Sequence, residues 1–203
     1  MTACGQLVCS ETAHQGYVPF VGFPKMPRLL REVVITEKID GTNAQIYITE
    51  ELQMHIGSRK RWINIHSDNY GFAQWATRHK DQLLKLGPGS HFGEWWGCGI
   101  QRRYNQECKK FSLFNTTRWA DGLTEDLREG QEHAPPCCHV VPELYRGPFD
   151  QEIIESILVD LRVCGSEAAP GFMRPEGVIV YHTQAGTGFK ITLDGDGHKG
   201  AKR

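Results

Sequence analysis

The segment EVVITEKIDGTNAQIYIT, residues 32–49, constrains the fold most strongly because it places an Asp-Gly pair between two runs of β-forming residues. This pattern predicts a strand, a turn and a second strand, at residues 32–39, 40–43 and 44–49. Alternation along the first strand places Lys38 and Asp40 on one face and Ile39 on the other, in the core. A lysine in this position fits either the solvated rim of a hairpin or a nucleophile held partly out of water.

The remainder of the chain predicts further strands and two helices. The strands are expected at residues 52–59, 91–96, 110–115, 176–182 and 187–193. Apolar residues at helical spacing predict helices over 72–87 and 149–165. Residues 1–32 contain breaking prolines, and 120–138 are polar and turn-rich, so both are expected to be irregular. The pattern indicates a mixed α+β domain with antiparallel sheets and flanking helices.

Composition narrows the function classes. A chain of 203 residues suits a single domain, 1–203, and a net charge of −1 gives no overall attraction to nucleic acid. Seven cysteines at irregular spacing fit reduced thiols better than a disulfide framework. The absence of a signal-peptide pattern and of a long apolar run predicts a cytoplasmic protein with no membrane partner.

Six segments, in order, resemble the motifs of the covalent nucleotidyltransferases, which comprise polynucleotide ligases and mRNA capping enzymes. They are KIDGTN (38–43), GSRKR (57–61), HFGEWWGCGIQ (91–101), FSLFN (111–115), EGVIV (176–180) and GFKIT (188–192). With Glu37 in front and Asn43 at its end, the first segment is most similar to the RNA-ligase-2 branch of ATP-dependent RNA ligases. The resemblance implies a nucleotidyltransferase (ATP-grasp-like ligase) domain.

The resemblance also implies a reaction. Lys38 would attack the α-phosphorus of ATP to give lysyl-AMP, pass AMP to an RNA 5′-phosphate, and leave a 3′-hydroxyl to displace it. Lys190 and Arg59 would contact phosphates, and Glu176 would help to hold Mg²⁺ or Mn²⁺. Asp40 would position Lys38 or the metal, unless it is only a turn residue.

The same resemblance implies a nucleotide pocket. Glu94 would accept hydrogen bonds from the ribose hydroxyls, Phe114 would stack on adenine, and Glu37 would contact the adenine amino group. Asn43 would serve the later, RNA-dependent steps. The structural alternatives are an ion pair for Glu94, core packing for Phe114 and a turn role for Asn43.

Two departures from the family pattern affect the prediction. Thr192 stands where many ligases have a second lysine after Lys190, and whether Lys199 replaces that lysine stays open. Few residues follow Lys190, so a catalytic domain without a C-terminal nucleic-acid-binding domain is expected. RNA affinity should then be weak and salt-dependent unless an accessory partner or a pre-held nick supplies it. The candidate basic patch comprises Arg59, Lys60, Arg61, Arg102, Arg103, Lys109 and Lys110.

Several alternatives stay open at this point. The same chemistry would serve a DNA-nick ligase or a GTP-dependent capping enzyme, and a non-catalytic RNA- or nucleotide-binding module could keep the fold. The RNA substrate could be a nicked duplex or single-stranded ends. A zinc site at His133, Cys137, Cys138 and His139 is a further alternative, although their spacing fits no common pattern.

Overall fold

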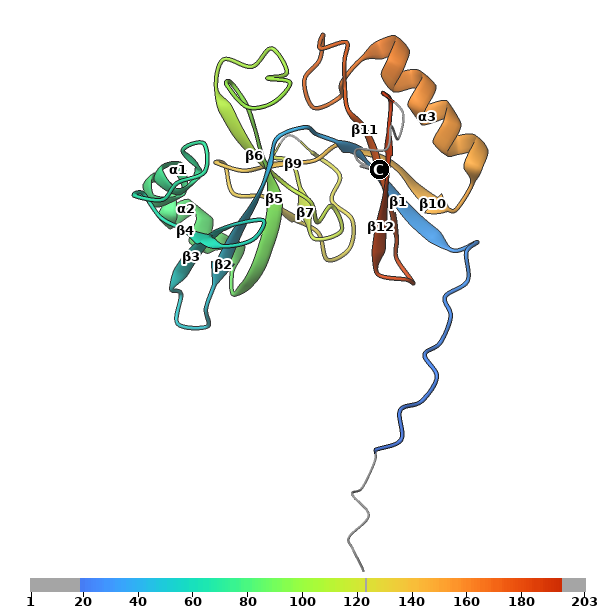
Figure 1. Cartoon of the computed structure of the whole chain (residues 1–203), viewed down its shortest axis with the longest axis horizontal. Coiled ribbons are helices and arrows are strands. Elements are labelled where there is room, and N and C mark those ends of the chain that lie inside the picture. Colours follow the sequence, from blue (N-terminus) through green and yellow to red (C-terminus); the bar gives the residue numbers. More distant parts are fainter. Residues whose placement is uncertain (1–18, 123, 195–203) are drawn as a thin grey trace, which may run out of the picture.

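The computed structural model describes residues 19–122 and 124–194, and within them two sheets lie side by side (Figure 1). The six-stranded sheet has the order β4 (Trp62–Ile63), β3 (Met54–Ser58), β2 (Thr42–Ile48), β5 (Gly89–Gly97), β6 (Lys109–Leu113) and β9 (His139–Val140). The four-stranded sheet has the order β10 (Glu143–Pro148), β1 (Glu32–Lys38), β11 (Gly177–His182) and β12 (Thr187–Thr192). A short parallel pair joins β7 (Trp119–Ala120) to β8 (Glu132–His133). The mixed α+β class is confirmed.

The predicted strand–turn–strand at residues 32–49 is not a hairpin. β1 pairs with β10 and β11 in one sheet, whereas β2 pairs with β3 and β5 in the other. Residues 39–41 therefore carry the chain from one sheet to the next. A Cβ on Gly41 would lie 2.5 Å from the Trp95 carbonyl oxygen and 2.7 Å from the Trp96 Cβ. Only glycine lets the crossing chain pass this close to β5.

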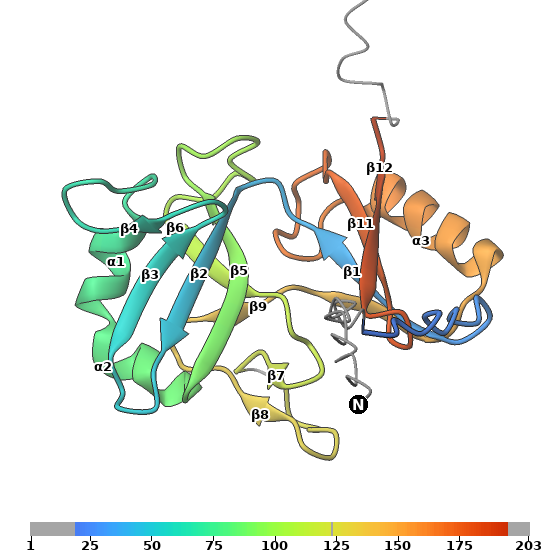
Figure 2. The same cartoon turned by 60° about the horizontal axis from the view of Figure 1, so that its bottom comes forward.

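Three apolar clusters hold the sheets and helices together. The outer face of the six-stranded sheet packs on α1 (Phe72–Arg78) and α2 (Lys80–Leu83), and the four-stranded sheet packs on α3 (Gln151–Cys164) (Figure 2). The third cluster joins the crossing residue Ile39 to Trp96 on β5 and to Phe172 before β11. We call the face of the six-stranded sheet that carries Trp96 its inner face. Ile39 is buried, as alternation predicted.

One helix prediction is confirmed and the other needs correction. α3 begins after Asp150, whose carboxylate accepts hydrogen bonds from two backbone N–H groups, and ends at Gly165 with a φ of 86°. The helix predicted over 72–87 is instead interrupted at His79, and a 3₁₀ turn (Leu84–Leu86) follows α2. The His79 ring lies 4.9 Å from the Trp75 ring and its Nδ1 lies 2.8 Å from the Trp75 carbonyl oxygen. These contacts accompany the break in the helical path.

The residue pattern of the sequence did not predict several short strands. β4, β7, β8 and β9 have two residues each, which is too short for any periodicity to show. β10 contains charged residues and a proline, and it lies at a sheet edge where such residues are tolerated. The segment 120–138 is not wholly a surface excursion, because Ala134 and Cys138 are buried against the six-stranded sheet.

No helix of the described residues is long and apolar enough to cross a membrane.

The crossing predicts a strong effect of Gly41→Ala. The added methyl group meets backbone on β5 that cannot move freely, so we expect a loss of about 1–3 kcal/mol in the free energy of unfolding. Urea denaturation would measure it. The control is Gly122→Ala, where a Cβ has no neighbour within 4 Å and a change within about 0.5 kcal/mol is expected. Equal stabilities of the two variants would contradict the close approach.

Candidate active site

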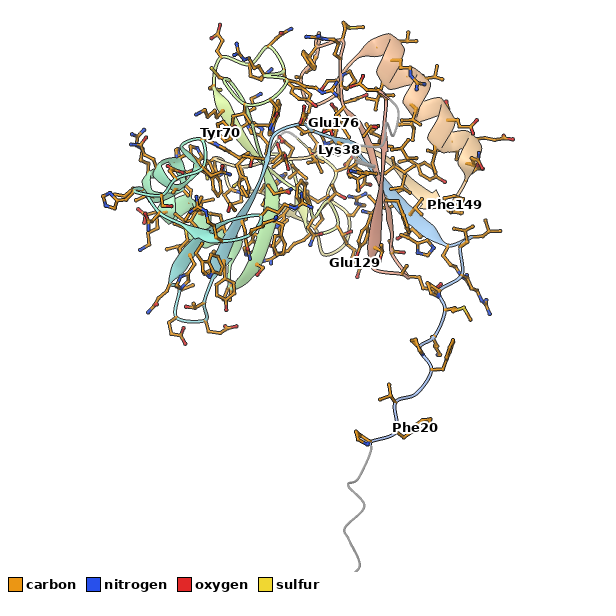
Figure 3. The ribbon with its side chains drawn as sticks, viewed as in Figure 1. Phe20, Lys38, Tyr70, Glu129, Phe149 and Glu176 are labelled. Carbon is orange, nitrogen blue, oxygen red and sulfur yellow. The ribbon has the colours of Figure 1, made fainter. Side chains whose placement is uncertain are left out.

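An ion pair between Lys38 and Glu176 lies where the chain leaves β1 (Figure 3). Lys38 is the last residue of β1 and stands opposite Gly177, the first residue of β11. Glu176 directly precedes that strand, and its Oε2 accepts a hydrogen bond from the Lys38 Nζ at 2.6 Å. The side chains are only 23% and 17% exposed. Pairing of two distant segments thus holds a lysine and a carboxylate together, partly shielded from water.

Glu94 lies on the inner face of β5, and both its carboxylate oxygens are engaged. Its Oε1 accepts from the Gly41 N–H at 3.0 Å and its Oε2 from the Asn43 Nδ2 at 3.1 Å. Burial raises the pKa of Glu94 to about 7, and the positive charge of Lys38 opposes this rise. The ion-pair alternative for Glu94 is not met, because its partners are the backbone of Gly41 and the amide of Asn43.

Strand register places further predicted residues on the same two faces. On the four-stranded sheet, Lys190 pairs with Ile179, two residues along β11 from the Lys38 partner Gly177, so both lysines share a face. On the six-stranded sheet, Glu94 pairs with Ser112, and the exposed Phe114 follows two residues later. The packing alternative for Phe114 is not met, because Phe111 and Leu113 fill the core instead.

Glu37 does not join this group. Alternation turns it away from Lys38, and it is almost fully buried. Its Oε1 accepts from the Ser166 Oγ at 2.6 Å and its Oε2 from the Ala168 N–H at 2.9 Å. Burial raises the pKa of Glu37, against the lowering effect of these bonds. Its adenine contact stays a prediction, while its visible contacts are with the segment after α3.

Arg102 connects three parts of the site. The sequence had indicated only a place in the candidate basic patch for it. Its Nε donates to the Asp40 Oδ2 at 3.1 Å, and its Nη2 lies 2.5 Å from the Asp194 Oδ2. Its Nη1 donates to the carbonyl oxygens of Arg174 and Pro175, just before Glu176. One guanidinium thus links the β1–β2 crossing, the approach to β11 and the end of β12. Its partners are distant in sequence, so no local pattern reveals them.

The other predicted positions are more dispersed. Arg59 lies exposed in the turn between β3 and β4. Lys199 falls outside the described residues. A cavity of about 640 Å³ opens along the inner face, lined by Trp96, Lys110, Ser112 and Ala168 among others, and its lining does not include Lys38, Glu94 or Glu176. No three histidine, cysteine, aspartate or glutamate residues of the described chain converge as metal ligands, so the residues of the zinc alternative do not form such a group.

Glu94 should make stability pH-dependent. Its raised pKa means that the folded state holds its proton more tightly than the unfolded state, so stability falls as the pH rises from about 4.5 through about 7. Glu94→Gln cannot titrate. Relative to wild type, it should gain up to about 3 kcal/mol in unfolding free energy between pH 5 and 8, measured by urea denaturation.

The matched control is Glu132→Gln, which makes the same replacement at an exposed position, and the change with pH should be larger for Glu94→Gln. Because only the change with pH is compared, any fixed cost of facing Asn43 with an amide cancels. Parallel pH profiles for Glu94→Gln and wild type would contradict the raised pKa.

Comparison with known proteins places this arrangement in a family. The family model for RNA ligase matches residues 31–192. No curated protein matches the chain. Solved structures of the Naegleria gruberi RNA ligase are similar at 18% identity. A lysine-to-alanine mutant with ATP and Mn has a TM-score of 0.53 and the match covers 81% of this chain and 50% of that one. A lysine-to-methionine mutant with AMP and Mn has a TM-score of 0.53, with 82% and 51% covered.

The chain thus spans about half the length of the structures that it matches. At this identity the likeness concerns the fold, whereas the family match extends over all six motif segments. By that match, and with Lys38, Glu94 and Glu176 gathered at one place, the chain belongs to the RNA ligase family.

Proposed function

We propose that residues 1–203 form the nucleotidyltransferase domain of an ATP-dependent RNA ligase of the RNA-ligase-2 type. The observation that carries the proposal is the pairing of Lys38 with Glu176, beside Glu94 and Asn43, where the two sheets meet. Binding alone does not need a half-buried lysine held by a carboxylate. An enzyme that forms a covalent lysyl-AMP intermediate does need one.

The first step joins the Lys38 Nζ to the α-phosphorus of ATP and releases pyrophosphate, and the amine must be uncharged to attack. Glu176 has the hard oxygen ligands that Mg²⁺ and Mn²⁺ prefer, and the metal neutralises phosphate charge when bound. One protein carboxylate is enough, because such ions often take their other ligands from phosphates and water. Glu176 would then be shared between the cation and the Lys38 Nζ, with which it pairs in this structure.

The remaining residues surround the nucleotide in this proposal. Lys190 shares the Lys38 face and would contact the α-phosphate, and Arg59 would contact a phosphate of AMP or RNA. Phe114 is free to stack on adenine. Each carboxylate oxygen of Glu94 already accepts one hydrogen bond, and its second lone pair would accept one from a ribose hydroxyl. Asn43 orients Glu94 and would act with it in the RNA-dependent steps.

The steps after lysyl-AMP would use RNA. AMP moves from the Lys38 nitrogen to the 5′-phosphate, and the 3′-hydroxyl of the second end then displaces AMP and closes the phosphodiester. Each transfer needs the same phosphate-neutralising residues in line with the new attacking oxygen. An accessory nucleic-acid-binding partner or domain would raise RNA affinity, because the candidate basic patch loses Arg102 to internal contacts.

The nucleophile predicts a covalent adduct. Wild-type protein incubated with α-labelled ATP and Mg²⁺ or Mn²⁺ should retain acid-stable label, with the AMP mass located at Lys38 by peptide mass spectrometry. Lys38→Ala should retain none, and Lys85→Ala, an exposed lysine on the 3₁₀ turn, should label normally. Label from GTP in place of ATP would indicate the capping alternative. No adduct with either nucleotide would overturn the proposal.

Arg102 predicts a second effect on the same reaction. Arg102→Lys keeps one charge but cannot reach Asp40, the carbonyls before Glu176 and Asp194 together. We expect lysyl-AMP formation to slow by about 10- to 100-fold, with a raised metal requirement, because Lys38 and Glu176 lose their common anchor. Single-turnover labelling over a range of Mg²⁺ concentrations measures both changes.

The exposed neighbour Arg103→Lys is the control and should match wild type. If Arg102→Lys has wild-type rates and metal dependence, Arg102 serves stability alone.

A further inference from the structure

A cluster of aromatic side chains lies on the inner face of the six-stranded sheet, farther along β2 than Asn43. Tyr47 follows Asn43 by four residues on the same face, and it pairs with His55 on β3. Trp62 on β4 pairs with Gly57, two residues from His55, so it joins the same face. The sequence offered no signal for this cluster, because its members come from three separate strands.

The three rings touch one another and leave the indole accessible. Ring centroids are 6.0 Å apart for Tyr47–His55, 6.2 Å for Tyr47–Trp62 and 5.8 Å for His55–Trp62. A Cβ on Gly57 would lie 3.2 Å from two carbons of the indole, so the missing side chain lets Trp62 lie down on the sheet. Trp62 is nonetheless 56% exposed.

This exposure distinguishes Trp62 from the other tryptophans. Trp95, Trp96 and Trp119 are buried, and Trp75 is half-buried against the core. Phe92, which pairs with Gln45 between Asn43 and Tyr47, is also 55% exposed. Large apolar rings gathered in the open are costly in water, and such surfaces usually serve binding.

Positive charge adjoins the rings. The turn between β3 and β4 carries Arg59, Lys60 and Arg61, all exposed and directly before Trp62. The Arg61 Nη1 donates to the Ser67 Oγ at 2.7 Å, which ties the turn to the following loop. No described residue forms an ion pair with Arg59 or Lys60, so both are available to phosphates. Exposed aromatic faces beside basic side chains match the two parts of a nucleic-acid strand.

We propose that Tyr47, His55, Trp62 and Phe92, with the Arg59–Arg61 turn, bind unpaired bases of an RNA strand close to the end being joined. The inference rests on the proposed ligase function and gives it a substrate class. A base can stack on an indole only when its own face is free, which excludes bases inside a continuous duplex. The cluster shares its sheet face with Asn43 and Glu94, so an RNA strand that lies along β2 would extend from the rings toward these two residues.

Intrinsic fluorescence tests the proposal directly, because Trp62 is the most exposed tryptophan. A 5′-phosphorylated single-stranded RNA should quench the emission and bind with moderate affinity, whereas a blunt duplex of the same sequence should do neither. Trp62→Leu should weaken single-strand binding by about 5- to 100-fold in fluorescence anisotropy with labelled RNA. Trp62→Phe should keep most of the affinity because it keeps a stacking face.

Two controls distinguish the stacking of bases on Trp62 from the attraction of phosphates to basic side chains and from a nonspecific effect of substitution. Val163→Ala, at an exposed position on α3, should bind RNA as wild type does. Lys60→Gln should weaken binding mainly at low salt and reduce the slope of log affinity against log salt by about 1. Trp62→Leu should leave that slope unchanged.

The outcomes distinguish this inference from the proposed function. Lysyl-AMP formation involves no RNA. An adduct at Lys38 together with unchanged RNA binding by Trp62→Leu would therefore contradict the proposed RNA-binding surface and leave the proposed ligase function standing. Equal binding of duplex and single strand would also contradict that surface. If the wild-type protein forms no adduct but its RNA binding depends on Trp62, the RNA-binding surface is supported and the proposed ligase function is contradicted.

Discussion

The passage of residues 39–41 from one sheet to the other is the constraint on which the rest of the structure depends. β1 ends at Lys38, and the chain then runs so close to β5 that Gly41 has no room for a side chain. Ile39 is buried in the cluster that joins the sheets, and the Gly41 N–H donates to Glu94. The same three residues thus pack the two halves together, directly after the β1–β11 pairing sets Lys38 opposite Gly177.

The charged side chains at this junction are balanced by side chains of opposite charge more than by solvent. Lys38 faces Glu176, and Glu94 lies near both with a pKa raised by burial. Arg102 offsets Asp40 and Asp194 while it anchors the carbonyls before Glu176. Several carboxylates near one lysine are costly without ligands, because each loses hydration. A site that binds a cation and a polyphosphate has a use for such an arrangement, since its charges are rebalanced in the complex.

The proposed RNA-binding surface beyond Asn43 would lie on the same sheet as Asn43 and Glu94 of the candidate site. The net charge of −1 gives little general attraction to RNA, and Arg102 is engaged internally. Stacking on exposed rings depends less on salt than phosphate contacts do, so it would supply affinity that the charge does not. The rings lie on β2, β3, β4 and β5, and β2 also carries Asn43, which donates a hydrogen bond to Glu94. RNA recognition would then share the six-stranded sheet with Asn43 and Glu94, and Lys38 would lie across the junction on β1 of the four-stranded sheet.

Local sequence determined the elements and the facing of their side chains. The periodicity of residues 149–165, the cap at Asp150 and the alternation that buries Ile39 and half-exposes Lys38 were all readable, because each depends on neighbours a few residues away. The motif resemblance also identified Lys38, Glu94 and Glu176 as one group. Tertiary structure decided which sheet each strand joins, that Glu37 turns to Ser166, and that Arg102 links three distant segments. Those outcomes depend on pairing between residues far apart in the chain, whose free energy no local pattern records.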